Sequence, residues 1–200
     1  MDEFQGNNKC PIEVEWKPYM IDPGTATKGE DVEAYCRRRW GGSGWTIHTK
    51  SEGKKDGGAM FNNWKWWPHT LKAHQLIEYC RTKGISTDKL NEELFKAEYE
   101  EGKNISEVNI LVEIGMKALL NGDKTDLTRY LVEDQGKERI KQDIMLGRQR
   151  YQISGVPHFI VGVEDNGNDG QIKAGQQKEF SGAQKSRFFS SLFQELLDGN

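Results

Sequence analysis

The residues best suited to do chemistry in this 200-residue chain are its three cysteines, Cys10, Cys36 and Cys80. A dithiol enzyme needs an attacking thiolate at a helix N-terminus and a resolving thiol one turn later. No two of these cysteines have that spacing, and Cys36 and Cys80 fall within amphipathic patterns, where cysteine behaves as a small apolar residue. Their odd number and wide separation also match neither a disulfide framework nor a zinc site. We therefore predict no catalytic cysteine.

The histidines offer a second kind of chemistry. His69, His74 and His158 have no carboxylate or cysteine near them at a recognisable metal-ligand spacing, so no metal site is predicted. Ser154 is not expected to be a hydrolase nucleophile, because the chain has no G-x-S-x-G elbow. No cofactor is indicated by any of these residues.

Tryptophans concentrate in one stretch of the chain. Residues 41–67 hold six glycines and, with Trp40, five of the six tryptophans. Glycine-rich backbone carrying large aromatic rings predicts a loop rather than a regular amphipathic helix. The rings either pack over the core or line a ligand site, since ligand pockets commonly have aromatic walls. Trp66, Trp67 and the following His69 are the candidates for ligand contact in this stretch.

Composition and charge limit the range of partners. The net charge is -3, and the only dense basic cluster, residues 37–39, has the position of a solvated helix end. No nucleic-acid partner is expected, because such binding generally needs a basic face. No apolar run approaches the length of a membrane helix, so no membrane insertion is expected. The N-terminus shows no signal peptide, and the expected location is the cytoplasm or the lumen of an organelle.

The elements that must position these residues follow a simple order. Residues 12–16 alternate apolar and charged side chains, which predicts a strand, and a turn at 22–24 follows. Helical patterns come next, then two apolar β-rich runs joined by a Gly/Asn/Asp turn, which predict an antiparallel hairpin. A last amphipathic helix closes the chain. The predicted ranges for the helices are 30–40, 68–81, 87–102, 106–121 and 126–151, the last divided into a short and a longer helix by a break near Gly136. The hairpin is predicted at 158–163 and 171–174, and the final helix at 182–198.

Four sequence motifs, which occur along the chain in the order seen in the DsbA family, resemble that family and in particular its FrnE-like branch. Residues 153–161, I-S-G-V-P-H-F-I-V, resemble the cis-proline strand of thioredoxin-like proteins, and S-G-A-Q at 181–184 resembles the start of their final helix. Residues 14–23, V-E-W-K-P-Y-M-I-D-P, resemble the second-strand segment of that branch. M-F-N at 60–62, followed by H-T-L-K-A-H-Q-L at 69–76, resembles its F-N-F … N-T-x-x-A-H-x-L.

The resemblance implies an α/β thioredoxin-like fold of DsbA type with a helical insertion. It implies one domain over residues 1–200, with a thioredoxin-like core at 12–22 and 153–200 and the insertion at 30–151. A cis Val156–Pro157 bond is expected from it, and Val156, Pro157 and His158 become ligand-binding candidates for an extended peptide or a thiol. His158 could contact such a ligand or tune a thiol, although surface or packing roles are commoner.

The family places a first strand and helix, carrying Cys-x-x-Cys or a serine, before the V-E-W segment. Only eleven residues precede Ile12 in this sequence, and a βαβ unit needs roughly 30. We expect that first strand-helix unit to be missing, which would leave a slot in the sheet for a partner protein or a second copy. The resulting hypothesis is a redox-inactive binding or assembly module. One alternative is an enzyme whose active-site segment is absent from this chain: a thiol-disulfide oxidoreductase, or a glutathione-dependent isomerase related to 2-hydroxychromene-2-carboxylate isomerase and kappa-class glutathione transferase. Another is a non-redox small-molecule binder that uses the tryptophan-rich stretch. A thiol or glutathione-like ligand is a possible partner.

Overall fold

A computed structural model of the chain describes residues 11–56, 59–119, 122–164 and 172–198. The chain folds into two compact units. One unit is Asp22–Met145, and the other combines the flanking segments Met1–Ile21 and Leu146–Asn200. Within the described residues, no helix has both the length and the apolar character needed to cross a membrane.

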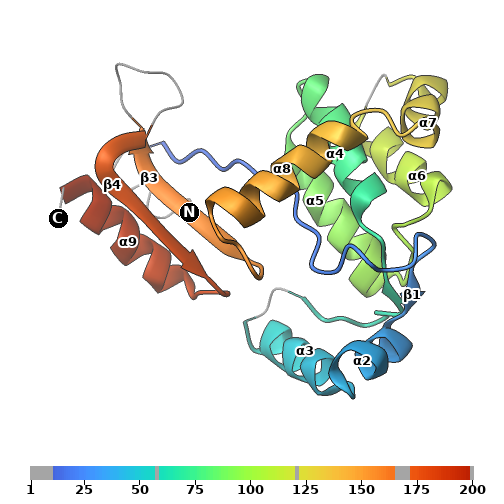
Figure 1. Cartoon of the computed structure of the whole chain (residues 1–200), viewed down its shortest axis with the longest axis horizontal. Coiled ribbons are helices and arrows are strands. Elements are labelled where there is room, and N and C mark those ends of the chain that lie inside the picture. Colours follow the sequence, from blue (N-terminus) through green and yellow to red (C-terminus); the bar gives the residue numbers. More distant parts are fainter. Residues whose placement is uncertain (1–10, 57–58, 120–121, 165–171, 199–200) are drawn as a thin grey trace. The chain divides into compact units, whose positions relative to one another are not determined.

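The unit Asp22–Met145 is mainly helical (Figure 1). A short antiparallel pair, with Glu30 opposite Trp67 and Asp31 opposite Trp66, joins its start to its middle. The elements, in order, are β1 (Glu30–Asp31), α2 (Val32–Trp40), α3 (Gly44–Asp56), β2 (Trp66–Trp67), α4 (Leu71–Thr82), α5 (Thr87–Phe95), the π-helical turn η1 (Lys96–Glu100), α6 (Val108–Ala118), α7 (Lys124–Val132) and the first part of α8 (Lys137–Arg150).

The core of this unit lies where α4, α5, α6 and α7 meet. Side chains at helical spacing on these elements are fully enclosed, and they include Leu76, Leu90, Leu111, Ile114, Leu127 and Leu131. Gly115 of α6 lets the helices approach, because a Cβ there would lie 2.7 Å from terminal methyl carbons of both Leu76 and Leu127. Burial of this apolar stripe stabilises the helices far more than their intrinsic propensities do.

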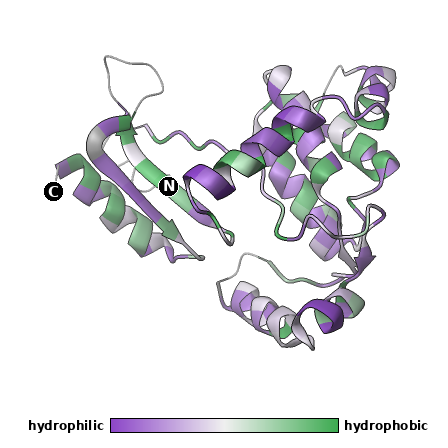
Figure 2. Ribbon diagram, in the orientation of Figure 1, coloured by the Kyte–Doolittle hydropathy of each residue, from purple (hydrophilic) through white to green (hydrophobic). Residues whose placement is uncertain are grey.

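The second unit contains a hairpin and a helix. The strands β3 (His158–Glu164) and β4 (Ile172–Ser181) pair antiparallel, with His158 opposite Ser181 and Phe159 opposite Phe180. Helix α9 (Ser186–Asp198) packs on the face that carries these phenylalanines, with the Phe189 ring centre 5.1 Å from that of Phe159. Figure 2 colours much of β3 and α9 as hydrophobic. The predicted hairpin and final helix are confirmed; most of the connecting turn lies outside the described residues.

The strand predicted at residues 12–16 is wrong. Residues 11–20 are neither helix nor strand, and the alternating side chains Val14 and Trp16 are 40% and 49% exposed. Alternation makes a strand only where the backbone pairs with a neighbouring strand. In the part of the chain that the structure describes, β3 and β4 form a two-stranded sheet with each other, and residues 12–16 are not a strand of it.

The loop predicted at residues 41–67 is also wrong in part, because α3 occupies its first half. In the sequence, five of the six glycines of this stretch come before Trp45 or after Asp56, and only Gly53 lies between them. Glycine at helix ends costs little, whereas glycine in the interior destabilises a helix. The preceding helix α2 was predicted correctly: the Asp31 carboxylate accepts from the Ala34 N–H at 2.8 Å, and Gly41 ends the helix with φ of 75°.

Candidate functional site

The turn before β3 carries three of the predicted ligand-binding residues. The Val156–Pro157 peptide bond is cis, and the Val156 side chain is 45% exposed. The Gly182 N–H donates to the Pro157 carbonyl at 2.8 Å. The Nδ1 atom of His158 lies 2.8 Å from the Oγ of Ser181. These two contacts hold the turn against the end of β4, so an exposed apolar side chain stands on a fixed support.

The other ring nitrogen of His158 is unusual. Its Nε2 atom is buried and has no hydrogen-bond partner among the described residues, whereas buried polar atoms normally have one. The imidazole is thus bonded on the Ser181 side only. His158 therefore helps to hold the turn in place through its contact with Ser181.

Trp67 of β2 is part of the packing of the helical unit. It is 8% exposed, its ring stacks on that of Tyr35, and its indole N–H donates to the Thr25 hydroxyl at 3.2 Å. Trp66 is half-buried, and its carbonyl accepts from the Trp64 indole N–H at 2.9 Å. Trp67 therefore presents no open ring face to a ligand.

His69 lies just after β2, where its backbone N–H donates to the Ser106 hydroxyl at 2.8 Å. Burial lowers the pKa of His69 below its ordinary value, and the charges of Lys137 and Lys72 lower it further. Lys72 itself donates to the Asp134 carboxylate at 2.8 Å. The imidazole is accordingly a neutral group beside a cationic patch.

The predicted ligand-binding residues fall into two groups. Val156, Pro157 and His158 adjoin each other in the unit with the hairpin, and Trp66, Trp67 and His69 adjoin each other in the helical unit. Among the described residues no group of three or more His, Cys, Asp or Glu side chains could hold a metal ion. Neither group has the composition of a complete catalytic site by itself.

Of the five tryptophans at residues 40–67, the two exposed ones are Trp40 and Trp45, which the sequence did not single out. Trp40 at the end of α2 and Trp45 at the start of α3 are each 41% exposed, and their ring centres lie 5.0 Å apart. The enrichment of tryptophan in this stretch is visible in the sequence. It could not tell which rings face solvent, because that depends on which rings Tyr35 and β2 cover.

The loop that leads to β2 is fixed by one carboxylate. Glu100 of η1 accepts from the backbone N–H groups of Met60, Phe61 and Asn62 at 2.9, 2.8 and 3.1 Å. Hydrogen bonds from Asn62, with those from Phe61 and Met60, lower the pKa of Glu100. Phe61 has a φ of 52°, a conformation that few non-glycine residues adopt. This clamp sets the path of the chain toward Trp64.

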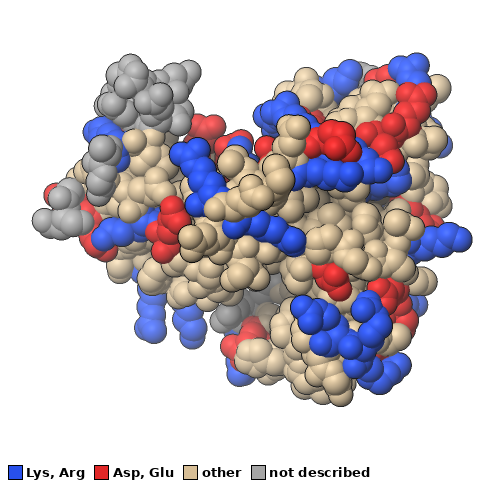
Figure 3. Space-filling view, viewed as in Figure 1, with Lys and Arg blue, Asp and Glu red and all other residues tan. Residues whose placement is uncertain are grey.

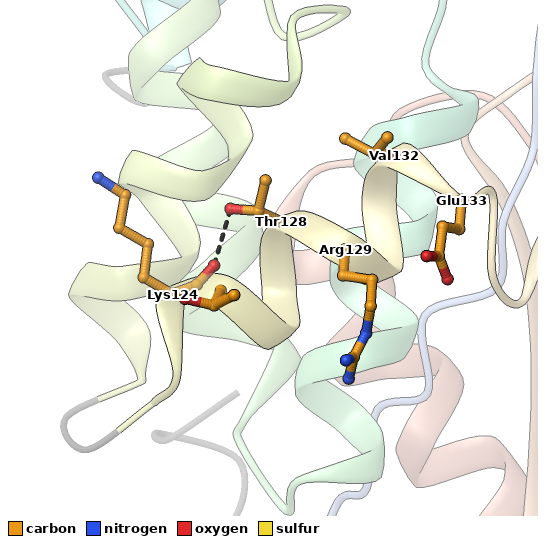
Figure 4. Close-up of a pocket in the computed structure, with 6 residues that line it drawn as sticks. Lys124, Thr128, Arg129, Val132 and Glu133 are labelled. Carbon is orange, nitrogen blue, oxygen red and sulfur yellow. Dashed lines mark hydrogen bonds between the residues drawn. The ribbon is translucent and has the colours of Figure 1, made fainter.

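A shallow hollow of about 430 Å³ lies along α7, and Figure 4 shows side chains of α7 lining it. The Thr128 hydroxyl donates to the Lys124 carbonyl of its own helix at 2.7 Å, and Arg129 pairs with Asp126 at 2.6 Å. The Thr128 and Arg129 side chains are thus bonded within their own helix, and the Glu133 carboxylate accepts from Gln135 at 3.0 Å. The hollow is a helix surface rather than a set of converging ligand groups.

The two cysteines that the structure describes are enclosed. Cys36 and Cys80 have no exposed surface, and Cys10 lies outside the described residues. Burial raises the pKa of Cys36 above its usual value and that of Cys80 to about 11. Since the thiolate is the nucleophile, both thiols are poor nucleophiles at neutral pH.

Comparison with protein families gives the class of the chain. The family model of the DSBA-like thioredoxin domain matches residues 1–194, so the chain belongs to the DsbA-like thioredoxin domain family. The predicted α/β thioredoxin-like fold of DsbA type is thereby confirmed, and the FrnE-like branch stays a prediction. A search among curated proteins found no match.

Proposed function

We propose that this chain is a redox-inactive binding or assembly module built on a DsbA-like thioredoxin fold. The observation that carries the proposal is the state of its thiols. The sequence contains no Cys-x-x-Cys pair, and Cys36 and Cys80 are buried with raised pKa values. Dithiol exchange needs an accessible thiolate with a lowered pKa. The environments of Cys36 and Cys80 have the opposite effect, since both thiols are buried and have raised pKa values.

The binding role is supported by the free side of the hairpin. In the described chain, β3 pairs with β4 on one side only, and Ile160 and Val156 are 37% and 45% exposed. A hairpin gains stability in water from a helix packed on its face, as α9 provides, or from further strands at its edge. We propose that an extended strand, from a partner protein or from a second copy of this chain, pairs with the free edge of β3.

The redox part of this proposal is tested by insulin reduction with dithiothreitol. If the proposal is right, the thiols of the wild-type chain do not contribute to insulin reduction. The wild-type chain should then give the same rate as a variant with Cys10, Cys36 and Cys80 replaced by serine. A Cys-x-x-Cys thioredoxin serves as the positive control. Turnover by the wild-type chain that the serine variant lacks would overturn the proposal.

The strand-addition part is tested by sedimentation with two matched substitutions. Ile160→Lys places a charge on β3, whereas Ile172→Lys places the same charge on β4, where Ile172 is 41% exposed. Concentration-dependent association that Ile160→Lys abolishes and Ile172→Lys retains is the expected result for self-pairing. A wild-type chain that stays monomeric, with amide hydrogens of β3 fully protected on both sides, would contradict it.

A second candidate follows from family membership. A thiol-disulfide oxidoreductase or glutathione-dependent isomerase could have its active-site segment outside this chain, with Val156, Pro157 and His158 on the substrate side. A thiol or glutathione-like ligand would then bind near His158. Titration of the chain with glutathione, followed by the perturbation of the His158 ring resonances, tests this candidate. An unchanged spectrum at saturating glutathione rejects it.

A further inference from the structure

Two exposed tryptophans, Trp40 and Trp45, lie at the end of α2 and the start of α3, and the last turn of α2 also carries Arg37 and Arg39. These four residues are called the tryptophan-arginine surface below. Trp40 and Trp45 are each 41% exposed, with their ring centres 5.0 Å apart. Large aromatic side chains side by side on a surface are typical of interaction sites rather than of solvated helices. Tryptophan and arginine are also the residues most enriched in the hot spots of protein interfaces.

These two rings are held firmly from below. Trp40 stands perpendicular to Tyr35 and to Trp67, with ring centres 5.3 and 5.6 Å away. Trp45 makes similar edge contacts with Trp64 and Trp67 at 5.6 and 5.7 Å. A ring fixed in this way loses little conformational entropy when a partner binds. The surface is therefore pre-organised.

Within the described residues, the indole N–H groups of the two exposed rings have no acceptor. Each buried neighbour has a partner for its indole N–H: Trp64 donates to the Trp66 carbonyl and Trp67 to the Thr25 hydroxyl. In contrast, neither Trp40 nor Trp45 donates to any protein acceptor in the described ranges. Two N–H donors thus remain available on this surface, and a partner rich in acceptors such as carboxylates can use them.

The segment that carries the two rings has a net positive charge. Residues 32–56 carry six Lys and Arg against three Asp and Glu, although the whole chain has a net charge of -3. Arg37, Arg38 and Arg39 occupy the last turn of α2, and Figure 3 shows basic side chains gathered over this helix. Glu30 engages Arg38 at 2.8 Å, and Glu33 lies 3.4 Å from exposed Arg37. Arg39 has no ion pair among the described residues.

We infer that the tryptophan-arginine surface binds an acidic segment of a partner protein, with an apolar side chain on the rings and carboxylates on Arg37 and Arg39. Local positive charge on an overall negative chain attracts a short acidic stretch and disfavours a long polyanion such as a nucleic acid. A membrane surface would need an apolar stripe along one helix face. The exposed side chains of α3 instead mix Trp45 and Ile47 with His48 and Lys54.

Tryptophan fluorescence of the full chain at low ionic strength, titrated with a short peptide of alternating glutamate and leucine, tests this inference. We expect a saturable change that added salt weakens. A peptide of alternating lysine and leucine should give no saturable change. Oligothymidylate and phosphatidylserine vesicles should bind more weakly than the acidic peptide.

Two substitutions with matched controls locate the binding. Trp45→Ala and Arg39→Glu should each weaken binding of the acidic peptide by about tenfold or more, as loss of a hot-spot contact does. Trp16→Ala removes another exposed tryptophan, and Lys89→Glu reverses another exposed charge; both should leave binding unchanged. Circular dichroism of each variant checks that it is folded.

Four results would overturn the inference. They are the absence of saturable binding by the acidic peptide, equal binding of the lysine peptide, tighter binding of oligothymidylate or of the vesicles, and equal losses in the control variants. The β3 edge is not involved in any of these measurements. The outcome is therefore independent of the strand-addition proposal.

Discussion

The ring of Tyr35 stacks on the indole of Trp67, with centres 4.1 Å apart and planes within 8° of parallel. This contact ties α2 to β2, two elements more than twenty residues apart. The Tyr35 hydroxyl extends the connection, because it donates to the Asp22 carboxylate at 3.3 Å. The stack is the centre of the small core that also holds Val32, Cys36 and Trp64.

Replacement of Trp67 by alanine should remove this centre. We expect Trp67→Ala to lower the free energy of unfolding by about 3–5 kcal/mol, because it deletes a large buried ring and leaves a cavity. Trp66→Ala is the matched control: Trp66 is half-buried, so the loss should be clearly smaller. Denaturation in guanidinium chloride followed by far-UV circular dichroism measures both. Equal losses would show that the stack has no special role.

The stability should also depend on pH through Glu98, which is 4% exposed. Burial raises the pKa of Glu98 from 4.5 to about 8. Between these values the unfolded chain is ionised at this position while the folded chain keeps its proton. The contribution of Glu98 to the free energy of unfolding is therefore fully present below pH 4.5 and is lost as pH rises to about 8.

The substitution Glu98→Gln should remove this dependence. The variant should gain stability relative to wild type as pH rises through this window, on the order of a few kcal/mol at its upper end. Urea denaturation at both ends of the window measures the gain. Glu92→Gln removes an exposed carboxylate of α5 and is the control. Parallel pH profiles for wild type and Glu98→Gln would contradict the prediction.

The two buried thiols should resist labelling. In a Cys10→Ser background, Cys36 and Cys80 should react with Ellman's reagent only on unfolding, because both are fully enclosed. The rise in the pKa of Cys80 to about 11 from 9.0 alone reduces its thiolate fraction about a hundredfold at neutral pH. Fast labelling of the native chain would disprove the enclosure, and labelling in denaturant provides the full-reaction reference.

The close approach at Gly115 can be tested by adding one methyl group. Gly115→Ala should destabilise the chain by about 1–3 kcal/mol through overpacking, because the new Cβ would lie 2.7 Å from buried Leu76 and Leu127. Alanine is otherwise the better helix former. Gly147→Ala in α8 is the control, since its Cβ would meet Ile153 at an ordinary 3.5 Å. Thermal unfolding should show a lower midpoint for Gly115→Ala only.

Local patterns predicted the helices and the hairpin well, because each has a strong signal within its own residues. The apolar β-rich run over residues 158–163 and the apolar stripe of α9 both correspond to observed elements. The same rules failed for residues 12–16, since a strand needs hydrogen bonds to a neighbour that its own sequence does not encode. They failed for α3 because a count of glycines over residues 41–67 ignores that only Gly53 lies in the interior of the helix.

The candidate ligand residues show the same division. The motif around Val156 and Pro157 was visible as a string of letters, and so was the excess of tryptophan between 40 and 67. From these tryptophans, the sequence analysis selected Trp66 and Trp67 as ligand candidates. In the structure Tyr35 covers Trp67, whereas Trp40 and Trp45 are exposed. Exposure of a ring depends on distant residues that pack over it, which no local pattern reports.

The sequence by itself determined the family-bearing motifs, the absence of a Cys-x-x-Cys pair and the order of the main helices and the hairpin. These properties reside in residue identity and short-range spacing. Only the tertiary structure decided that Cys36 and Cys80 are enclosed, that Glu98 is buried and that Trp40 and Trp45 face solvent. Burial is set by the packing of segments far apart in the chain, and it is burial that fixes which thiols, carboxylates and rings can react or bind.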